Sequence, residues 1–304
     1  MRPDVCVVIP TFRRPEGVRR ALNSVFLQDG VQALVEIVVL DNDPDASARQ
    51  TVKALAAGAR WPVIYGHEPE PGVANARNAA LRLTKARLIA FLDDDEYATP
   101  GWLEGLLDTR ECTNADLVFG PVQGRLDGKT PHRRYIEARF SRTGPAQSGC
   151  IEDYHGCGNS LLKRDRFFSD PPLFDPANNE IGGEDDALFS KAKADGAVIA
   201  WAAQALVYED IPPERATLTY AMAKAFAFGQ GPTQTCWQHR KVLGVLYWMA
   251  VGLGQASVFG ALYALRRLAG AKGQPEMLDR AAQGLGKLLW FKGLEPRFYG
   301  AAAL

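Results

Sequence analysis

The chain has 304 residues, of which 47% are hydrophobic, so it can bury a substantial core. Its 35 basic and 35 acidic residues give a formal net charge of zero, which argues against nucleic acid as a partner held by bulk charge.

The amino terminus and the cysteines indicate a cytoplasmic protein. The apolar run at 5–9 ends at Pro10 and is too short for the apolar segment of a secretory signal. The five cysteines are odd in number and lack metal-type spacing, so we expect reduced thiols.

Short apolar runs alternate with segments of helical spacing over the first hundred residues. This alternation predicts βαβ units with right-handed crossovers, and hence an α/β fold with a mostly parallel sheet flanked by helices. The expected strands are 5–9, 35–40, 63–65 and 88–92, and the expected helices are 17–27, 47–57 and 73–84.

Polar residues follow three of these expected strands. They lie at 10–14, 41–43 and 93–95. The carboxyl ends of parallel strands meet at one edge of a sheet, which is where open α/β sheets bind ligands. We therefore expect the three polar segments to converge on one pocket.

Asp93, Asp94 and Asp95 form an acidic triplet after the fourth strand. Adjacent carboxylates repel one another and are costly to desolvate unless water or a cation compensates them. Oxygen ligands without nearby Cys or paired His favour Mg²⁺ or Mn²⁺ over zinc. Taken alone, an acidic turn before a helix, with Pro100 in its first turn, is an equally good interpretation.

Two further residues suit a nucleotide diphosphate ligand. Asp41 could accept hydrogen bonds from the N–H edge of a base, although an Asx-type turn explains it equally well. Arg77, near the start of a helix that follows Gly72, could bridge to the acidic triplet or to a phosphate. The alternative for Arg77 is a surface position on an amphipathic helix.

The second half offers fewer signals. Residues 115–119 predict a strand, and the following stretch to about residue 150, rich in Gly, Pro, Arg and His, is expected to be a mobile loop. Arg133 and Arg134 could meet an anionic acceptor there, but a solvated charge pair is the simpler interpretation. Residues 160–162 predict another strand, and His155 before it is more simply a polar surface residue than a catalytic one.

Residues 182–194 predict a helix that begins with two glycines and three acids. Acidic residues in a first turn are favoured by the helix dipole, which by itself accounts for Glu184, Asp185 and Asp186. Another helix is expected at 214–229.

Residues 242–265 carry no charge and are flanked by Arg240-Lys241 and Arg266-Arg267. We weigh two short interfacial helices broken at Gly252 and Gly254, a single membrane span, and a soluble packed hairpin. We favour the first, because tryptophans at 237, 248 and 290 suit a membrane interface. Small residues recur every four positions, which suits close helix packing, at Gly252, Ala256, Gly260 and Ala264.

Five motifs in this order resemble family-two glycosyltransferases with the GT-A fold. They are VVIPTFRR at 7–14, VVLDND at 38–43, GVANARNAAL at 72–81, IAFLDDDE at 89–96 and GGEDD at 182–186. The resemblance implies an inverting enzyme that transfers a sugar from a nucleotide-sugar donor to an acceptor hydroxyl. It covers about the first 230 residues and implies a GT-A domain over 1–230, with a donor half to about residue 120 and an acceptor half from about 121 to 230. The apolar composition that follows predicts a helical membrane-associating region at 231–304.

The resemblance also assigns roles to donor-side residues. Asp95 would bind Mn²⁺ or Mg²⁺ directly, and Asp93 or Asp94 would hold the ribose or a metal-bound water, with Asp93 as a second metal ligand. A histidine ligand that many such enzymes carry is missing after 205–207, and Glu209 or an extra water could replace it. The donor nucleotide-binding residues would be Pro10, Thr11, Phe12, Arg13, Asp41, Arg77, Asp93 and Asp94.

On the acceptor side, the resemblance makes Asp185 the general base and lets Glu184 position the base or the acceptor. Gly158 and Asn159 resemble the segment beside the donor sugar and the acceptor.

The substrates follow from the same resemblance. UDP is the commonest donor nucleotide in such enzymes, and the acceptor would be a sugar or a lipid-linked glycan of surface polysaccharide or glycolipid synthesis. We expect peripheral contact with the cytoplasmic face of the inner membrane. The alternatives are a sugar nucleotidyltransferase, whose usual Gly-rich loop with a lysine is missing from 10–14, and a non-catalytic nucleotide-sugar-binding module.

Overall fold

The computed structural model describes residues 2–128, 130–164, 168, 172–179, 183–271, 274–296 and 298. The described chain forms two compact units, one made of residues up to 125 and 140–210, the other of 126–139 and 211–298. The second unit resumes after Asp210 and includes α7 (Leu218–Gln238), and the expected limit of the GT-A domain at residue 230 stays a prediction.

The first unit is built on a large sheet with the strand order β3-β2-β1-β4-β9-β6-β10-β8. Four strand pairs are parallel, β1 with β2, β1 with β4, β2 with β3 and β6 with β10, so the prediction of a mostly parallel sheet is confirmed. Strand β9 is antiparallel to β4 and β6, and β8 is antiparallel to β10. The strands are β1 (Val5–Thr11), β2 (Val35–Asp41), β3 (Val63–His67), β4 (Leu88–Phe91), β6 (Leu117–Phe119), β8 (Gly149–Cys150), β9 (Ser160–Lys163) and β10 (Ile199–Trp201).

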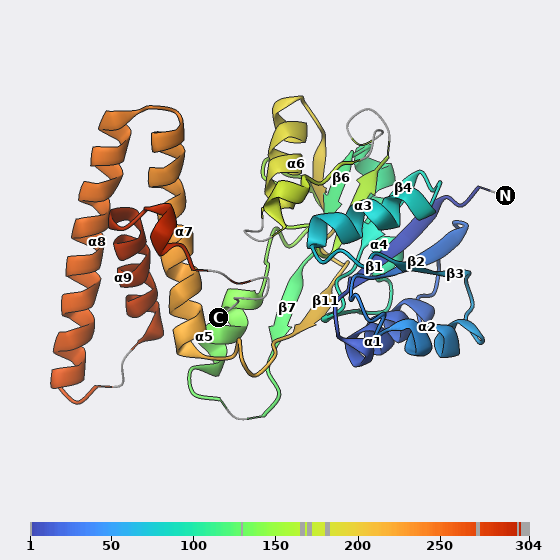
Figure 1. The fold of residues 1–304 in the computed structure, drawn as a ribbon, viewed down its shortest axis with the longest axis horizontal. Coiled ribbons are helices and arrows are strands. Elements are labelled where there is room, and N and C mark those ends of the chain that lie inside the picture. The colour runs from blue at the N-terminus through green and yellow to red at the C-terminus, as the bar shows by residue number, and fades with distance from the viewer. Residues whose placement is uncertain are drawn as a thin grey trace. The chain divides into compact units, whose positions relative to one another are not determined.

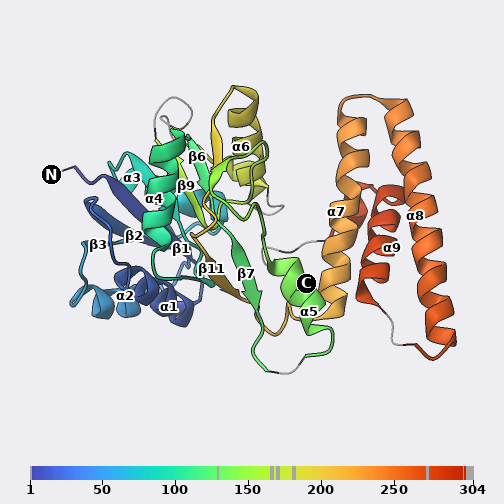
Figure 2. The same ribbon diagram turned by 180° about the vertical axis from the view of Figure 1, so that it is seen from behind.

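Helices cover both faces of this sheet (Figures 1 and 2). Side chains alternate along β1, so Val7 packs with α1 (Pro15–Phe26), α2 (Arg49–Ala56) and α4 (Trp102–Thr113). Val8 faces the other way, into a cluster with α3 (Val73–Leu83) and α6 (Glu184–Ala194). Burial of both faces explains why these strands read as uninterrupted apolar runs.

A smaller sheet has the order β5-β11-β7. Its strands are β5 (Glu96–Ala98), β7 (Val122–Arg125) and β11 (Val207–Asp210). Strand β11 is antiparallel to β5 and parallel to β7.

The expectation of a mobile loop between residues 120 and 150 is wrong. The segment contains β7, α5 (Arg133–Phe140) and β8. Val122 and Arg142 exchange two backbone hydrogen bonds of 2.8 and 3.0 Å, which fix the ends of the segment on the first unit. Long-range pairing of this kind leaves little trace in local composition, which is dominated here by Gly, Pro and charged residues.

In the second unit, α7, α8 (Val242–Leu268) and α9 (Pro275–Leu288) pack side by side (Figure 1). Short 3₁₀ turns lie at Pro176–Asn178 in the first unit and Lys292–Leu294 in the second. The carboxylate of Asp279 on α9 is buried and accepts hydrogen bonds from the Tyr135 hydroxyl at 2.6 Å and the Gln283 amide at 2.5 Å. Because Tyr135 lies on α5, this carboxylate holds α5 against α9.

Helix α8 is continuous, so the favoured prediction of two short helices broken at Gly252 and Gly254 is wrong. A glycine costs only about 1 kcal/mol in a helix, and Gly252 is used for packing. A Cβ atom at Gly252 would lie 2.6 Å from the carbonyl oxygen of Gly284 on α9, and one at Gly284 would lie 2.6 Å from the backbone nitrogen of Ala256. The expected small-residue stripe is therefore confirmed as a helix contact at its first two positions.

Among the described residues, α8 is a helix long and apolar enough to cross a membrane, judged by length and composition, and only 11% of its most apolar window is buried. This is weak evidence for a membrane, because a helix of a soluble protein can meet the same criteria.

Two glycines provide a test of the helix packing. We expect Gly284→Ala to lower the free energy of unfolding by about 1 to 3 kcal/mol, because its methyl group has no room against α8. Gly254→Ala is the matched control, since nothing lies near its Cβ position, and it is expected to raise stability by up to about 1 kcal/mol. Chemical denaturation of both variants measures the difference, and equal effects would contradict the packing.

Candidate active site

The carboxyl ends of β1, β2 and β4 meet, as the sequence predicts. The Thr11 hydroxyl donates to Oδ2 of Asp94 at 2.8 Å, and the backbone N–H of Phe12 donates to the same oxygen at 3.4 Å. The backbone N–H of Asn42 donates to the Thr11 carbonyl at 2.8 Å. Three loops from distant parts of the sequence therefore share one edge of the sheet.

Asp94 and Asp95 share one guanidinium. Nη1 of Arg14 lies 3.0 Å from Oδ1 of Asp94 and 2.7 Å from Oδ2 of Asp95. Burial, with the charge of Asp95 beside it, raises the pKa of Asp94 to about 6 in spite of Arg14. Asp94 thus ties the loop after β1 to the loop after β4, and its predicted contact with a ribose stays a prediction.

Arg77 joins Asp93 to the start of α6. Its side chain is buried, forms an ion pair with Glu184 and places Nη2 3.6 Å from Oδ1 of Asp93. The rings of Phe174 and Phe91 lie 5.4 and 6.0 Å from the guanidinium carbon. Burial opposes the charge on Arg77, but the surrounding acidic groups outweigh burial and raise its pKa. The surface position considered for Arg77 is therefore wrong.

Helix α6 begins with Glu184 and Asp185, the acidic pair that is expected to include the general base. Burial raises the pKa of Glu184, an effect that the charge of Arg77 opposes, and the Glu184 carboxylate is taken up by that ion pair. Gly183 precedes the helix in a left-handed conformation with φ of +86°, whereas Gly182 lies outside the described residues.

Asp185 is held in place by two backbone N–H groups. Cys157 donates to Oδ2 at 2.8 Å and Asp186 donates to Oδ1 at 2.8 Å. Burial raises the pKa of Asp93 against the opposing charge of Arg77, and the charges of Asp95 and Asp185 raise it further, so Asp93 and Asp185 share one region. Asp186 is exposed and accepts a hydrogen bond from the Tyr154 hydroxyl at 2.8 Å.

The loop that contacts Asp185 also contacts the acidic triplet. A Cβ atom at Gly158 would lie 2.7 Å from Oδ2 of Asp93 and 3.0 Å from Oε1 of Glu96. Only glycine allows the backbone to approach these carboxylates so closely. Gly158 therefore lies against the acidic side chains, and its expected place beside the donor sugar and the acceptor stays a prediction.

Glu96 is a buried acid of the site that the motif analysis does not assign. Its Oε2 accepts the backbone N–H of Asp93 at 2.9 Å, and burial raises its pKa well above the usual range. Glu209 pairs directly with Glu96 across β11 and β5, so both side chains leave the small sheet on one face. This pairing does not test the suggested use of Glu209 as a metal ligand, which stays a prediction.

The carboxylates suit a divalent cation that arrives with a ligand. Among the described residues, no group of three His, Cys, Asp or Glu side chains is arranged to hold a metal ion. Mg²⁺, however, commonly uses one or two carboxylates together with substrate phosphates and water. Asp93 and Asp95, whose side chains are 33% and 19% exposed, could serve in that way.

Asp41 lies inside the protein. Its exposed fraction is 0%, and its carboxylate accepts hydrogen bonds from the backbone N–H of Asp43 at 3.1 Å and of Ala48 at 2.8 Å, and from the Tyr65 hydroxyl at 3.0 Å. The bond to Asp43 is the Asx-type turn that the sequence allows as an alternative. The assignment of Asp41 to a nucleotide base gains no support from this geometry.

The Asn159 side chain also points into the protein rather than toward an acceptor. Its Oδ1 accepts the indole N–H of Trp102 at 2.7 Å, and its Nδ2 donates to the carbonyls of Pro121 and Ala205 at 2.8 Å each. The exposed fraction is 0%. Asn159 therefore joins the start of α4 to the connecting segments at Pro121 and Ala205.

Arg142 supports the main chain of the site, and no motif in the sequence predicts this role. Its guanidinium donates to the carbonyl oxygens of Gly120, Gly156, Gly158 and Asn159 at 2.7 to 2.9 Å. Within the sequence it stands in a polar stretch without a motif, so no local signal marks it.

His155 is an aromatic packing residue. It lies 5.6 Å from the ring of Phe119 and 5.4 Å from that of Trp201. Burial and the nearby charge of Arg142 lower the pKa of His155 to about 4. It is therefore neutral at pH 7, and it is half-buried against these two rings rather than a fully exposed polar residue.

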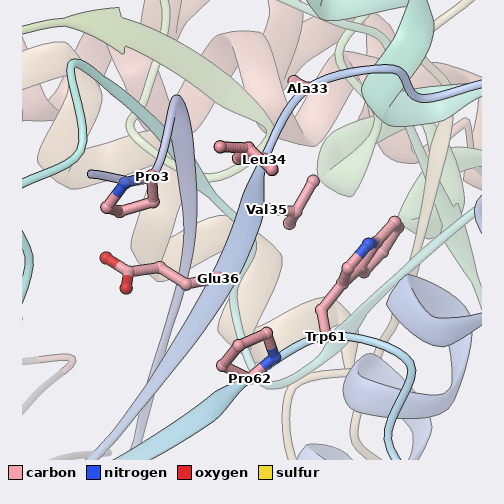
Figure 3. Close-up of a pocket in the computed structure, with 7 residues that line it drawn as sticks. All are labelled: Pro3, Ala33, Leu34, Val35, Glu36, Trp61 and Pro62. Atoms are coloured by element: carbon pink, nitrogen blue, oxygen red, sulfur yellow. The ribbon is translucent and has the colours of Figure 1, made fainter. Parts of the chain in front are cut away.

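A hollow of about 300 Å³ lies at the opposite edge of the large sheet, where β2 and β3 begin (Figure 3). The carboxylate of Glu36 in its lining accepts a hydrogen bond from the Thr84 hydroxyl. The hollow is separate from the acidic site and is lined by Pro3, Ala33, Leu34, Val35, Glu36, Trp61 and Pro62.

Comparison with known families identifies this arrangement. The family model described as "Glycosyl transferase family 2" matches residues 6–168, which include β1, β4 and the acidic triplet. The chain belongs to glycosyltransferase family 2. The family match ends before α6 begins. Asp185, the expected general base of this family 2 enzyme, therefore lies outside the matched region.

Named relatives support the same assignment. "Succinoglycan biosynthesis protein ExoM" of Rhizobium meliloti is 33% identical over 221 residues, which cover 72% of this chain and 71% of ExoM. "Glycosyltransferase AglE" of Haloferax volcanii is 28% identical over 44% of each chain, so this family 2 enzyme spans less than half of that relative.

Solved structures confirm the GT-A-like fold. Residues 1–349 of S. aureus TarS match with a TM-score of 0.53 and 17% identity, over 74% of this chain and 64% of that one. The same fragment in complex with UDP-GlcNAc matches with a TM-score of 0.50 and 17% identity, over 70% and 59%. The chain thus spans less than two thirds of these structures, and the likeness concerns the fold.

Asn159→Asp tests the buried position of Asn159. The variant places a carboxylate oxygen against the carbonyls of Pro121 and Ala205, so we expect the free energy of unfolding to fall by about 3 kcal/mol. Asn75→Asp, at an exposed amide, is the matched control and should change it by less than about 0.5 kcal/mol. Urea denaturation measures both, and a stable Asn159→Asp protein would contradict the assignment.

Proposed function

We propose that this family 2 glycosyltransferase transfers a sugar from a UDP-sugar to an acceptor hydroxyl with inversion, by direct displacement. The observation that carries the proposal is the Asp185 carboxylate, held by the N–H of Cys157 close enough to Asp93 for their charges to interact. A base and a donor-binding acid in one region are what a single displacement requires.

The donor would bind at the edge formed by β1, β2 and β4. The loop at 10–14 closes over the acidic triplet through Thr11 and Arg14, and its exposed Phe12 and Arg13 are available to a base and a phosphate. The choice of UDP is supported only at the level of fold, by the TarS structures that contain UDP and UDP-GlcNAc.

Asp93 and Asp95 would hold a divalent cation, Mg²⁺ or Mn²⁺, which when bound offsets the negative charge of the leaving diphosphate. Their positions on either side of Asp94, at the carboxyl end of β4, support this role, because a cation held there would lie near the proposed donor edge.

Asp185 would accept the proton of the acceptor hydroxyl as that oxygen forms a bond to the anomeric carbon. The bond from this carbon to the diphosphate oxygen breaks in the same step, and the electron pair leaves with UDP. The two N–H groups that hold Asp185 fix its direction before the acceptor arrives. Glu184 would act through Arg77, because it is paired with that guanidinium.

A role in surface polysaccharide synthesis is supported by the name of ExoM, a succinoglycan biosynthesis protein. The acceptor would be a sugar on a growing, lipid-linked glycan.

The second unit would rest on the cytoplasmic face of the inner membrane. Large apolar side chains on α8 are exposed to solvent, and no charge interrupts them between Lys241 and Arg266. Basic residues at both ends of the helix suit an anionic bilayer surface and a helix lying in its plane. The exposed apolar residues of α8 include Leu243, Leu246, Tyr247, Leu253, Val258, Leu262 and Leu265.

Asp185→Asn tests the base. We expect the turnover rate to fall by about 10² to 10⁴ while UDP still stabilises the protein against heat, because the donor site is unchanged. Transfer is measured with the nucleotide-sugar that stabilises the wild-type protein most, on a panel of sugar and lipid-linked acceptors. Asp186→Asn is the matched control and should retain activity, since this neighbouring acid is exposed and bonded to Tyr154. Equal losses in both variants would refute the assignment.

A double variant, Leu246→Ser with Leu253→Ser, tests the membrane surface. Each leucine is 58% exposed, so the fold should persist while the affinity for phosphatidylglycerol vesicles falls by at least about tenfold. The matched control replaces two exposed leucines of the first unit, Leu27→Ser with Leu34→Ser, and should bind as the wild type does. Vesicle cosedimentation measures binding, and an unaffected double variant would contradict the proposal.

A further inference from the structure

Arginine side chains neutralise the acidic triplet in this structure. Asp93 faces Arg77 at 3.6 Å, whereas Asp94 and Asp95 share Arg14 at 3.0 and 2.7 Å. A divalent cation is the charge expected to neutralise these carboxylates, so the two arginines occupy the places where positive charge is required.

The two arginines differ in how firmly they are held. The Arg77 side chain is 6% exposed and is enclosed by Glu184 and two phenylalanine rings. The Arg14 side chain is 35% exposed, and both of its ion-pair contacts run through Nη1. Arg14 can therefore leave its partners without unpacking the core.

Asp94 and Asp95 also differ. Asp94 keeps the hydroxyl of Thr11 and the N–H of Phe12 as partners if Arg14 moves away. Oδ2 of Asp95 receives the shorter contact from Arg14, and Asp95 is the residue expected to bind metal. A cation at about 2.1 Å from this oxygen would lie beside the guanidinium, and repulsion between the two positive charges disfavours both at one carboxylate.

We propose that Arg14 is an internal counter-ion of Asp95 that competes with a divalent cation, and that the diphosphate of the donor ends this competition by drawing the guanidinium onto its phosphates. Metal and nucleoside diphosphate then bind cooperatively. The inference rests on the metal-dependent donor binding proposed above.

The physical basis is the preference of a guanidinium for phosphate and the cost of placing two cations on one carboxylate. Without a diphosphate, a metal ion on Asp95 lies beside the positive charge of Arg14, whether or not the guanidinium moves away, and this repulsion weakens metal binding. With a diphosphate, the charge of Arg14 has an anionic partner. By linkage, the nucleotide must strengthen metal binding by the same factor by which the metal strengthens nucleotide binding.

The test is a titration of the full chain with Mn²⁺, followed by electron paramagnetic resonance of the free ion, with and without UDP. For the wild type we expect weak binding of Mn²⁺ alone and at least tenfold tighter binding with UDP. Removal of a charge-assisted contact should let Arg14→Gln bind Mn²⁺ alone about tenfold to a hundredfold tighter than the wild type, with little further gain from UDP.

Two variants separate charge from shape. Arg14→Lys retains the charge and should bind Mn²⁺ alone as weakly as the wild type. Arg19→Gln removes a nearby charge on α1 whose partner is Glu16, outside the triplet, and should leave the effect of UDP unchanged. If thermal unfolding shows that Arg14→Gln is unfolded, Arg14→Met replaces it as an unbranched neutral variant.

The outcomes distinguish the two proposals. In one outcome, the wild type binds Mn²⁺ in a UDP-dependent way and the folded Arg14→Gln variant has the same Mn²⁺ affinity as the wild type. This outcome overturns only the role of Arg14. Absence of Mn²⁺ binding in every variant, with and without UDP, overturns the metal-dependent donor site and the role of Arg14 together.

Discussion

The mutual repulsion of carboxylates at one edge of the large sheet is the constraint on which the first unit depends. Asp93, Asp94 and Asp95 stand at the end of β4, and Glu96 follows them into the protein. Such a group of acids is costly to bury without compensating charge. Arginines from separate segments provide that charge in the described structure, and Gly158 provides the space that the carboxylates need.

The same contacts connect the parts of the proposed reaction. Arg77 links Asp93 to the start of α6, and the loop at 156–159 links Asp185 to the acidic triplet. Arg142 holds that loop through main-chain carbonyls, so the position of the proposed base depends on a residue that does not contact Asp185. The geometry is set by buried, hydrogen-bonded side chains, whereas the more exposed Arg14 and Phe12 remain available to a ligand.

Much of the first unit was predictable because its signals are local. Apolar runs and helical spacing predict β1 to β4 and α1 to α3, and parallel pairing then requires the strand ends to meet. The elements between 120 and 150 were not predictable in this way, because Val122 and Arg142 pair across twenty residues of mixed composition. The continuity of α8 was missed because a glycine can serve either to break a helix or to pack it.

The α/β class, the sheet edge at which polar residues gather and the residue types found there can be read from the sequence, since they follow from periodicity and from the order of motifs. What each side chain faces depends on the folded chain. It turned Asp41 and Asn159 inward as structural groups, paired Glu184 with Arg77, and placed Arg14 on Asp95. A carboxylate or an amide looks the same in the sequence whether it is buried as a structural group or binds a ligand. Its role depends on partners that lie far away in the chain.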